Sequence, residues 1–165
     1  MKRHPGLQPF SRHHHFALVR ALELRRAAES PDGPQAPVLP AAARTFLAFW
    51  QHEGKTHFRE EEEVLLPAYA RATTMETDAD VQRMLAQHAK IRGLAADLEA
   101  ALACGANLQA LAADLGQLLQ EHVHLEEDII FPRIEQVLGE EALREMGAHL
   151  TELHPPRSGS DKTQP

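Results

Sequence analysis

Apolar residues recur at intervals of three and four along most of the chain, and no run alternates between apolar and polar residues. Such a period is typical of amphipathic α-helices with one buried face. Pro67 lies inside the second helical stretch, where it predicts a kink or an end, and Gly54 weakens the middle of that stretch slightly. The predicted helices cover residues 9–29, 41–72 and 78–103, and a fourth runs from 108 toward the breaks at Pro132 and Gly139.

Helices of this length need partners, because each apolar face must pack against another one. The segment 30–40 is rich in turn formers and separates the first two helices. We therefore predict an all-α fold, an up-down antiparallel four-helix bundle over residues 7–150. A short amphipathic helix at 140–150 is expected to cross one end of the bundle, and residues 151–165 are expected to be a disordered tail.

Histidine and glutamate interrupt the predicted apolar faces at similar depth. A glutamate in such a position is costly unless a metal ion or a hydrogen-bond donor compensates its charge. The predicted buried faces of the second, third and fourth helices are Phe46, Trp50, His57, Glu61, Val64 and Ala68; Met84, His88, Ile91, Ala95, Leu98 and Leu102; and Leu111, Leu115, Leu118, His122, Glu126 and Ile129.

The strongest signal is an internal repeat, in which residues 57–67 match residues 122–132 without a gap. Each copy places a histidine and a glutamate four residues apart, so both side chains lie on one helix face. Imidazole nitrogen with carboxylate oxygen suits iron or manganese, and a carboxylate can bridge two ions. One such pair is usually a solvated ion pair, but two copies on predicted core faces favour a metal site. Its central ligands would be His57, Glu61, His122 and Glu126.

Other histidines are candidates to complete this site. His88 alone would more often be a core histidine, but its place on a buried face between two metal-binding helices favours a ligand. In the run of residues 13–15, adjacent side chains point about 100° apart, so not all of them can face inward. His14 and His15 both stand above apolar residues, and the sequence leaves the choice between them open.

The remaining polar residues of the motifs have less specific roles. Glu60 is the best reserve ligand, because it lies three residues from His57. The other motif acids are expected to be solvated or to support the ligands, namely Glu62, Glu63, Glu127 and Asp128. Surface positions are expected for His52, His124 and His149, and core positions for Phe46, Trp50 and Phe131.

Charge and cysteine content exclude several classes of protein. The formal net charge is −7 and no basic stripe is visible, which argues against nucleic-acid binding. A single cysteine, Cys104, cannot form an internal disulfide or a thiolate metal site. The chain shows no apolar signal core and no run near the roughly 20 apolar residues of a membrane helix. These features predict a soluble cytoplasmic protein.

Together these residues resemble the hemerythrin-like, or HHE cation-binding, family. The resemblance covers about residues 7–138 and rests on an inward histidine in the run 13–15, both His-x-x-x-Glu motifs, the proline ten residues after each motif histidine, and His88 between them. It implies a bundle around a non-haem centre of two iron ions, for which manganese or zinc can substitute. The implied ligands are Glu61 and Glu126 as bridging carboxylates, His57 with His14 or His15 on one iron, and His88 with His122 on the other.

Two departures from the family pattern bear on function. Oxygen-carrying hemerythrins have a further histidine four residues after the one matched by His88, and here that residue is Arg92. This leaves a coordination position to water, Glu60 or another carboxylate, and it speaks against simple reversible oxygen carriage. Iron–sulfur cluster repair proteins carry a glutamate directly before the same histidine, and here Gln87 offers a neutral amide instead.

The sequence therefore predicts a di-iron protein that binds or senses oxygen, nitric oxide or peroxide. We favour a binding or sensing module over an enzyme, because no separate catalytic base or substrate pocket can be read from the sequence. The alternatives are a di-iron oxidoreductase acting on peroxide or nitric oxide, including the cluster repair type, and iron storage, iron delivery or a structural metal site. The predicted partner is a small diatomic ligand or peroxide, with no nucleic acid and no membrane.

Overall fold

The structure is a computed structural model and describes residues 3–29, 39–75 and 78–153. Throughout these ranges the regular elements are helices, as the periodicity predicts, and no strand is present. The predicted linker up to residue 38 and the predicted tail from residue 154 lie outside the described residues. None of the described helices combines the length and the apolar content that crossing a membrane requires.

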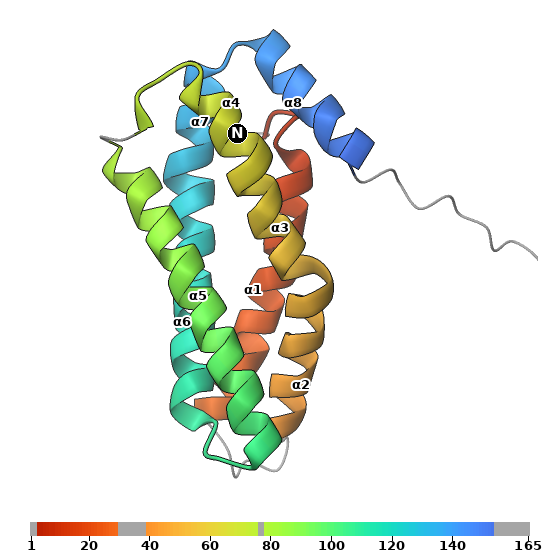
Figure 1. Cartoon of the computed structure of the whole chain (residues 1–165), viewed down its shortest axis with the longest axis vertical. Coiled ribbons are helices and arrows are strands. Elements are labelled where there is room, and N and C mark those ends of the chain that lie inside the picture. Colours follow the sequence, from red (N-terminus) through yellow and green to blue (C-terminus); the bar gives the residue numbers. More distant parts are fainter. Residues whose placement is uncertain (1–2, 30–38, 76–77, 154–165) are drawn as a thin grey trace, which may run out of the picture.

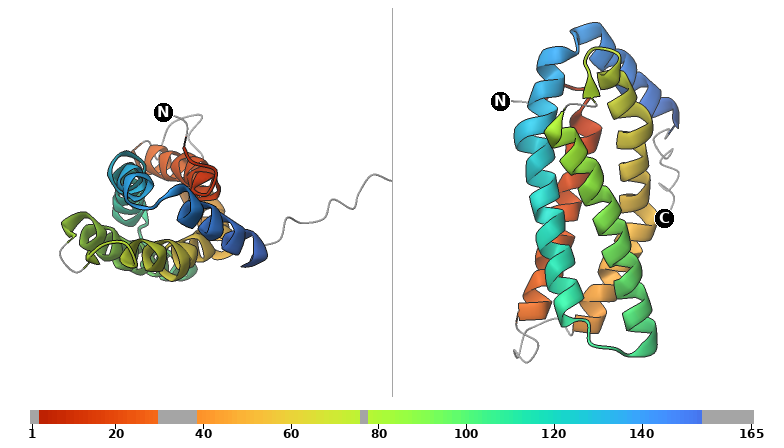
Figure 2. Two further views of the ribbon diagram at one scale, coloured as in Figure 1. Left: turned by 90° about the horizontal axis from the view of Figure 1, so that it is seen from above. Right: turned by 60° about the vertical axis from the view of Figure 1, so that its left-hand side comes forward.

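The described residues form four helical arms and one further helix (Figure 1). The arms are α1 (Gln8–Glu29); α2 (Leu39–Phe49), η1 (Trp50–Gly54), α3 (Lys55–Glu60), η2 (Glu61–Leu65) and α4 (Leu66–Ala70); α5 (Ala79–Cys104); and α6 (Gln109–Leu125), η4 (Glu126–Ile130) and α7 (Phe131–Val137). Successive arms run in opposite directions, and α8 (Glu140–Leu153) crosses the end of the bundle where α1 begins (Figure 1 and Figure 2). The predicted up-down bundle is confirmed, and α8 extends three residues past its predicted end at residue 150.

Local sequence sets both ends of α5. At its start, the Asp78 carboxylate accepts hydrogen bonds from the amides of Asp80 and Val81, at 3.1 and 3.3 Å. These amides have no partner inside the helix, so the cap stabilises the first turn. At the other end, Gly105 adopts a left-handed conformation with φ of 72°, which costs glycine no steric strain. The two caps define the helix that carries His88.

Wide π-helical turns interrupt the second and fourth arms directly before Pro67 and Pro132. In η2 the amide of Leu66 donates to the carbonyl of Glu61, five residues earlier, and η4 repeats this bond before Pro132. In a regular helix a proline ring collides with the carbonyl four residues before it, and a wider turn relieves this collision. The disturbance predicted at Pro67 is therefore a π turn, and the helix continues to Ala70.

The extra residue in η4 changes which side chain faces the core. The periodicity predicts Ile129 on the buried face, but 38% of Ile129 is exposed and Ile130 is buried instead. A π turn contains about one residue more than an α turn, so each later position moves round the helix by roughly 100°. Every other predicted core position is buried or, at Leu102 and Leu111, partly buried.

Trp50 and Gly54 are matched to each other in η1, where the second arm bends between α2 and α3 (Figure 1). The Trp50 indole is buried and lies directly over the glycine, so that a Cβ at Gly54 would lie 2.5 Å from Trp50 Cε3. Sequence periodicity treats Gly54 as a weak point of the helix, whereas the structure needs it for the close approach of this ring.

Replacing Gly54 by alanine is expected to lower the free energy of unfolding by about 1–3 kcal/mol, because the added methyl group collides with the Trp50 ring. The matched control is Gly93 in α5, where nothing lies within 4 Å of the Cβ position. Gly93→Ala should instead stabilise the protein by up to about 1 kcal/mol, since alanine favours the helix. Urea unfolding measures both, and equal effects would contradict the packing argument.

Two separate apolar clusters fill the bundle, and a polar layer lies between them. Along α5, Met84 belongs to one cluster, Ile91 belongs to the other, and the fully buried His88 lies between them. The same order occurs along α1, where His14 separates the two clusters. The layer therefore brings polar side chains of different arms to one level inside the bundle.

Candidate metal centre

Six buried histidine and glutamate side chains, drawn from all four arms, meet in this polar layer. Each is at most 5% exposed, and their nitrogen or oxygen atoms that face the centre have no hydrogen-bond partner within the described residues. Such atoms are costly to bury, and imidazole nitrogen with carboxylate oxygen is a donor set suited to a metal cation. The six are His14 (α1), His57 (α3), Glu61 (η2), His88 (α5), His122 (α6) and Glu126 (η4).

The six side chains form two groups that share both glutamates. One group adds His14 and His57 to the glutamate pair, and the other adds a histidine from α5 and one from α6. In each group the candidate ligand atoms lie within 4.8 Å of one another. Two ligands at right angles around one ion lie about 3 Å apart, so each group has the dimensions of a metal site. The arrangement is able to hold two cations side by side.

Each glutamate reaches histidines of both groups. Glu61 Oε1 lies 3.1 Å from His57 Nε2, and Glu61 Oε2 lies 3.3 Å from His88 Nε2. The two oxygens of one carboxylate thus face different histidine pairs, as a bridging carboxylate requires. Glu126 is placed in the same way: its Oε1 lies 3.2 Å from His122 Nε2, and its Oε2 lies 2.9 Å from His14 Nε2.

The carboxylates and the imidazoles shift one another's pKa values. Burial would raise the pKa of Glu61, but the imidazoles of His57 and His14, whose Nε2 atoms lie 3.1 and 3.6 Å from Glu61 Oε1, hold it well below its usual range. Burial would lower the pKa of His88, but the carboxylates of Glu126 and Glu61, 3.6 and 3.3 Å from its Nε2, raise it to about 10. The pKa of His14 lies well above its ordinary value for the same reason. Burial dominates at His122 and lowers its pKa to about 4.

Every inward-facing histidine has its second ring nitrogen held by a neighbour. Glu127 Oε1 lies 2.6 Å from His14 Nδ1, and Glu62 Oε1 lies 2.7 Å from His88 Nδ1. Such outer partners fix the tautomer, orient the ring and increase the basicity of the nitrogen that faces a metal. The other two contacts are 3.3 Å from His57 Nδ1 to His13 Nδ1 and 3.3 Å from His122 Nδ1 to Gln87 Oε1.

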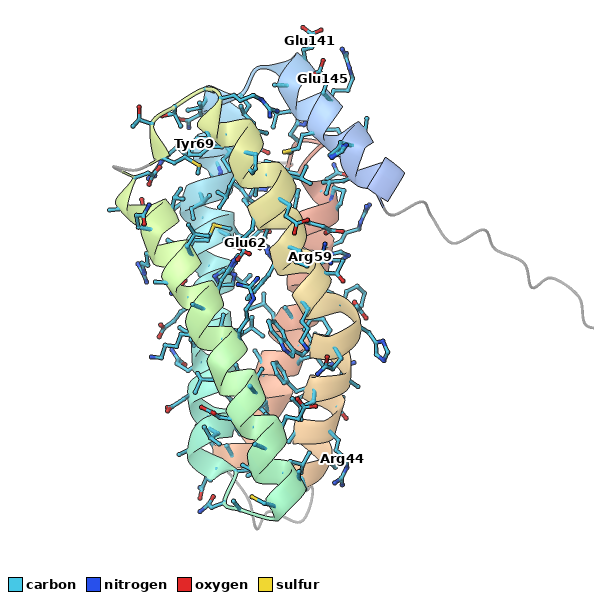
Figure 3. All side chains as sticks on the ribbon, viewed as in Figure 1. Arg44, Arg59, Glu62, Tyr69, Glu141 and Glu145 are labelled. Atoms are coloured by element: carbon cyan, nitrogen blue, oxygen red, sulfur yellow. The ribbon has the colours of Figure 1, made fainter. Side chains whose placement is uncertain are left out.

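The two outer glutamates are in turn paired with arginines. Arg92 binds Glu62 with two nitrogens, at 2.8 and 3.0 Å, and Arg3 binds Glu127 at 2.7 Å. In Figure 3, Glu62 lies between its own helix and α5, whereas Arg59 lies on the exposed side of the same arm. Burial would raise the pKa of both glutamates. Arg92 and His88 lower that of Glu62, and His14 with Arg3 lowers that of Glu127 to about 2. Arg92, found where the family resemblance expects a further histidine, therefore supports His88 from outside through Glu62.

The two glutamates that hold the outer ring nitrogens can be found in part from the sequence. The sequence predicts that Glu62 and Glu127 are solvated or support the ligands, and both contact a histidine of the centre. The repeat carries this signal, because each copy has a glutamate directly after the inward one. The partner Arg3 was missed, and no local pattern could have found it, since it lies 124 residues from Glu127 in the chain.

His15 does not join the centre. It is exposed, and its ring lies beside Phe16 with a centroid distance of 5.7 Å, whereas the adjacent His14 is buried. The two side chains point about 100° apart, so the packing of α1 can turn only one of them inward. The choice that the sequence left open falls on His14. Exposed positions are confirmed for His52, His124, His149, Glu63 and Asp128, and buried ones for Phe46, Trp50 and Phe131.

A small apolar cavity adjoins the centre. Its volume is about 10 Å³, and its lining includes Trp50, Phe58 and Val123 together with His57 and His122. A space of this size holds one small molecule at most, and an apolar lining disfavours water. A larger hollow of about 420 Å³ at the α8 end is lined by none of the six residues of the centre.

Glu127→Gln is expected to weaken metal binding about 10- to 100-fold, because it removes the negative charge behind His14 without changing any residue that faces the centre. The number of ions bound at saturating metal should not change. Anaerobic titration of the metal-free protein with Fe²⁺ measures both quantities. Glu63→Gln is the control, since Glu63 is exposed and pairs only with Arg59 among the contacts seen; an equal loss in this variant would refute the role of Glu127.

Comparison with known proteins points to one family. The family model described as the Hemerythrin HHE cation binding domain matches residues 9–134. This range contains all six residues of the centre, ends inside α7 and leaves α8 outside. Searches among curated proteins and among solved structures returned no match.

Proposed function

Because the chain belongs to the hemerythrin HHE cation-binding family, we propose that it is a non-haem di-iron protein that binds or senses oxygen, nitric oxide or peroxide. The two glutamates shared by four buried histidines support this most strongly. Mixed nitrogen and oxygen ligation suits iron, and shared carboxylates are the means by which helical bundles hold two such ions. The inward atoms that have no hydrogen-bond partner in the described structure fit this requirement.

The donor set would give each iron two imidazoles and the two shared carboxylates. An ion held by four protein donors would keep free positions for an outside ligand. When bound, the iron pair supplies a site for a small ligand and a means of exchanging electrons with it. In the proposed centre, His14 and His57 would hold one iron, His88 and His122 would hold the other, and Glu61 and Glu126 would be shared by both.

The surrounding residues favour a small ligand and keep the imidazoles in place. The apolar cavity beside His57 and His122 is about as large as one water molecule, so it leaves no room for a large substrate. Glu62 and Glu127 each hold the outer nitrogen of an inward histidine, so the ligand nitrogens keep one orientation. Oriented imidazoles with no room for a large substrate beside them support binding or sensing of a small ligand such as oxygen, nitric oxide or peroxide.

Metal analysis and spectroscopy test the proposal together. Protein purified without added metal, or reconstituted anaerobically with Fe²⁺, should contain about two irons per chain, one for each group of ligands. Addition of oxygen or nitric oxide to the anaerobic ferrous protein should change its optical and magnetic spectra. Spectra that stay unchanged would argue against a ligand-binding role. Turnover above that of free iron would identify an oxidoreductase, and easy loss of iron to a weak chelator would indicate delivery.

A further inference from the structure

A second group of metal-ligating side chains lies on the outer side of His57. His13 Nδ1 lies 3.3 Å from His57 Nδ1 and 4.0 Å from Glu60 Oε2. Candidate ligand atoms of the three residues lie within 4.8 Å of one another. Separations of roughly 3–4 Å are those of ligands that share one ion at about 2.1 Å. This group reaches the surface, because 37% of the His13 side chain is exposed.

We propose that His13, Glu60 and the Nδ1 side of His57 form an outer cation site, which captures Fe²⁺ and passes it to the inner centre. The proposal rests on the di-iron function proposed above. Its geometric basis is the ring of His57, which has one nitrogen in each site. Nδ1 faces His13, and Nε2 lies 3.1 Å from Glu61 Oε1. An ion held by the outer group is therefore one imidazole away from the inner ligands.

Burial explains why the inner centre needs such a site. Glu61 and Glu126 are fully buried, so a hydrated ion cannot meet them directly, and it must exchange water for protein ligands in steps. The largely buried Glu60 supplies a negative charge 4.0 Å from the half-exposed His13, and Glu53 lines the same cavity as His13 and His57. Negative charge at a partly buried opening raises the local concentration of cations and the rate at which they arrive.

Filling of the inner centre would empty the outer site. While Nδ1 of His57 binds the outer ion, the ring carries its hydrogen on Nε2. Binding of the inner ion through Nε2 would release that hydrogen to water, and Nδ1 would take one from water once the outer ion has left. His57 would then donate it to His13 Nδ1, 3.3 Å away. The outer group loses its third ligand at that stage. The outer site is thus transient, and the loaded protein retains only the ions of the inner centre.

The rate of iron uptake tests the outer site. Metal-free full-length protein is mixed with Fe²⁺ under anaerobic conditions, the reaction is stopped at intervals with a chelator, and protein-bound iron is measured. His13→Gln and Glu60→Gln should each slow uptake about tenfold, because capture is lost, and the final iron content should equal that of the wild type. His15→Gln is the matched control, since it makes the same change at the exposed position two residues away. Circular dichroism establishes that each variant is folded.

The outcomes separate the two proposals. Wild-type uptake rates in both His13→Gln and Glu60→Gln would overturn the outer site. A lower final iron content in these variants would also overturn it, because the residues would then belong to the permanent centre. A wild-type protein that takes up no iron would overturn the proposed di-iron function itself.

Discussion

Glutamine in place of Glu126 is expected to remove both metal ions rather than one. The two oxygens of Glu126 lie 3.2 Å from His122 and 2.9 Å from His14, so this carboxylate belongs to both groups of ligands. Without its charge, two cations would face each other with Glu61 as the only shared anion, and their repulsion would rise. The affinity for metal should fall by more than about 100-fold. Loss of a residue that only supports a ligand costs at most about that much. Metal analysis at saturating Fe²⁺ measures the loss.

The neighbouring residue provides the matched control for this variant. Glu127→Gln makes the same chemical change one position along the chain, where the side chain contacts the outer nitrogen of His14. It should keep both ions at saturating metal. If Glu126→Gln retained one tightly bound ion, the carboxylate would serve a single metal, and the bridging assignment would be wrong.

The metal-free protein is expected to lose stability as the pH rises from about 6.5 toward 10, whereas bound metal should protect it. The pKa of His88 is raised to about 10, and that of His14 lies well above its ordinary value. A histidine with a raised pKa stabilises the fold fully below its unfolded pKa of about 6.5, and this contribution disappears as the pH rises through the folded pKa. Ligand histidines bind metal without these protons, so the loss does not occur in the metal-bound protein.

Thermal unfolding at pH 6.5 and 8.5, with and without Zn²⁺, measures this effect. The rise in Tm caused by metal should be larger at pH 8.5, and each ion should add about 4 kcal/mol when free metal is 1,000 times Kd. Below pH 6.5 the metal-free protein should also weaken, because burial lowers the pKa of His13 and His122 to about 4. The Glu126→Gln variant should show little response to metal. A Tm of metal-free protein that is equal at both pH values would contradict the protonation of His14 and His88.

Much of the centre could be predicted because its signal is local. His57 and Glu61 lie four residues apart on one helix, so their common face follows from helix geometry, and the second copy of the motif repeats the design. Both pairs lie in the polar layer, as the periodicity predicts. His88 was found in the same way, from its place on an apolar face. These features depend on near neighbours in the chain.

Corrections arose where local periodicity changes or where distant segments meet. The π turn before Pro132 moved Ile129 out of the core and brought Ile130 in, because one extra residue rotates all later positions. Gly54 proved to be a packing requirement of Trp50 rather than a weak point. Neither the π turn nor the packing of Trp50 on Gly54 can be predicted from apolar residues spaced three and four apart, because both occur where the helix departs from regular α geometry.

The sequence by itself determined the all-helical class, the lengths of the arms and the paired motifs, because helix periodicity and capping depend on residues a few positions apart. Only the tertiary structure decided that His14 rather than His15 faces the centre, and that Arg3 holds Glu127 across 124 residues. The rotation of each helix about its axis is set by packing against the other three arms. That rotation requires all four apolar faces at once, so no single segment of the sequence contains it.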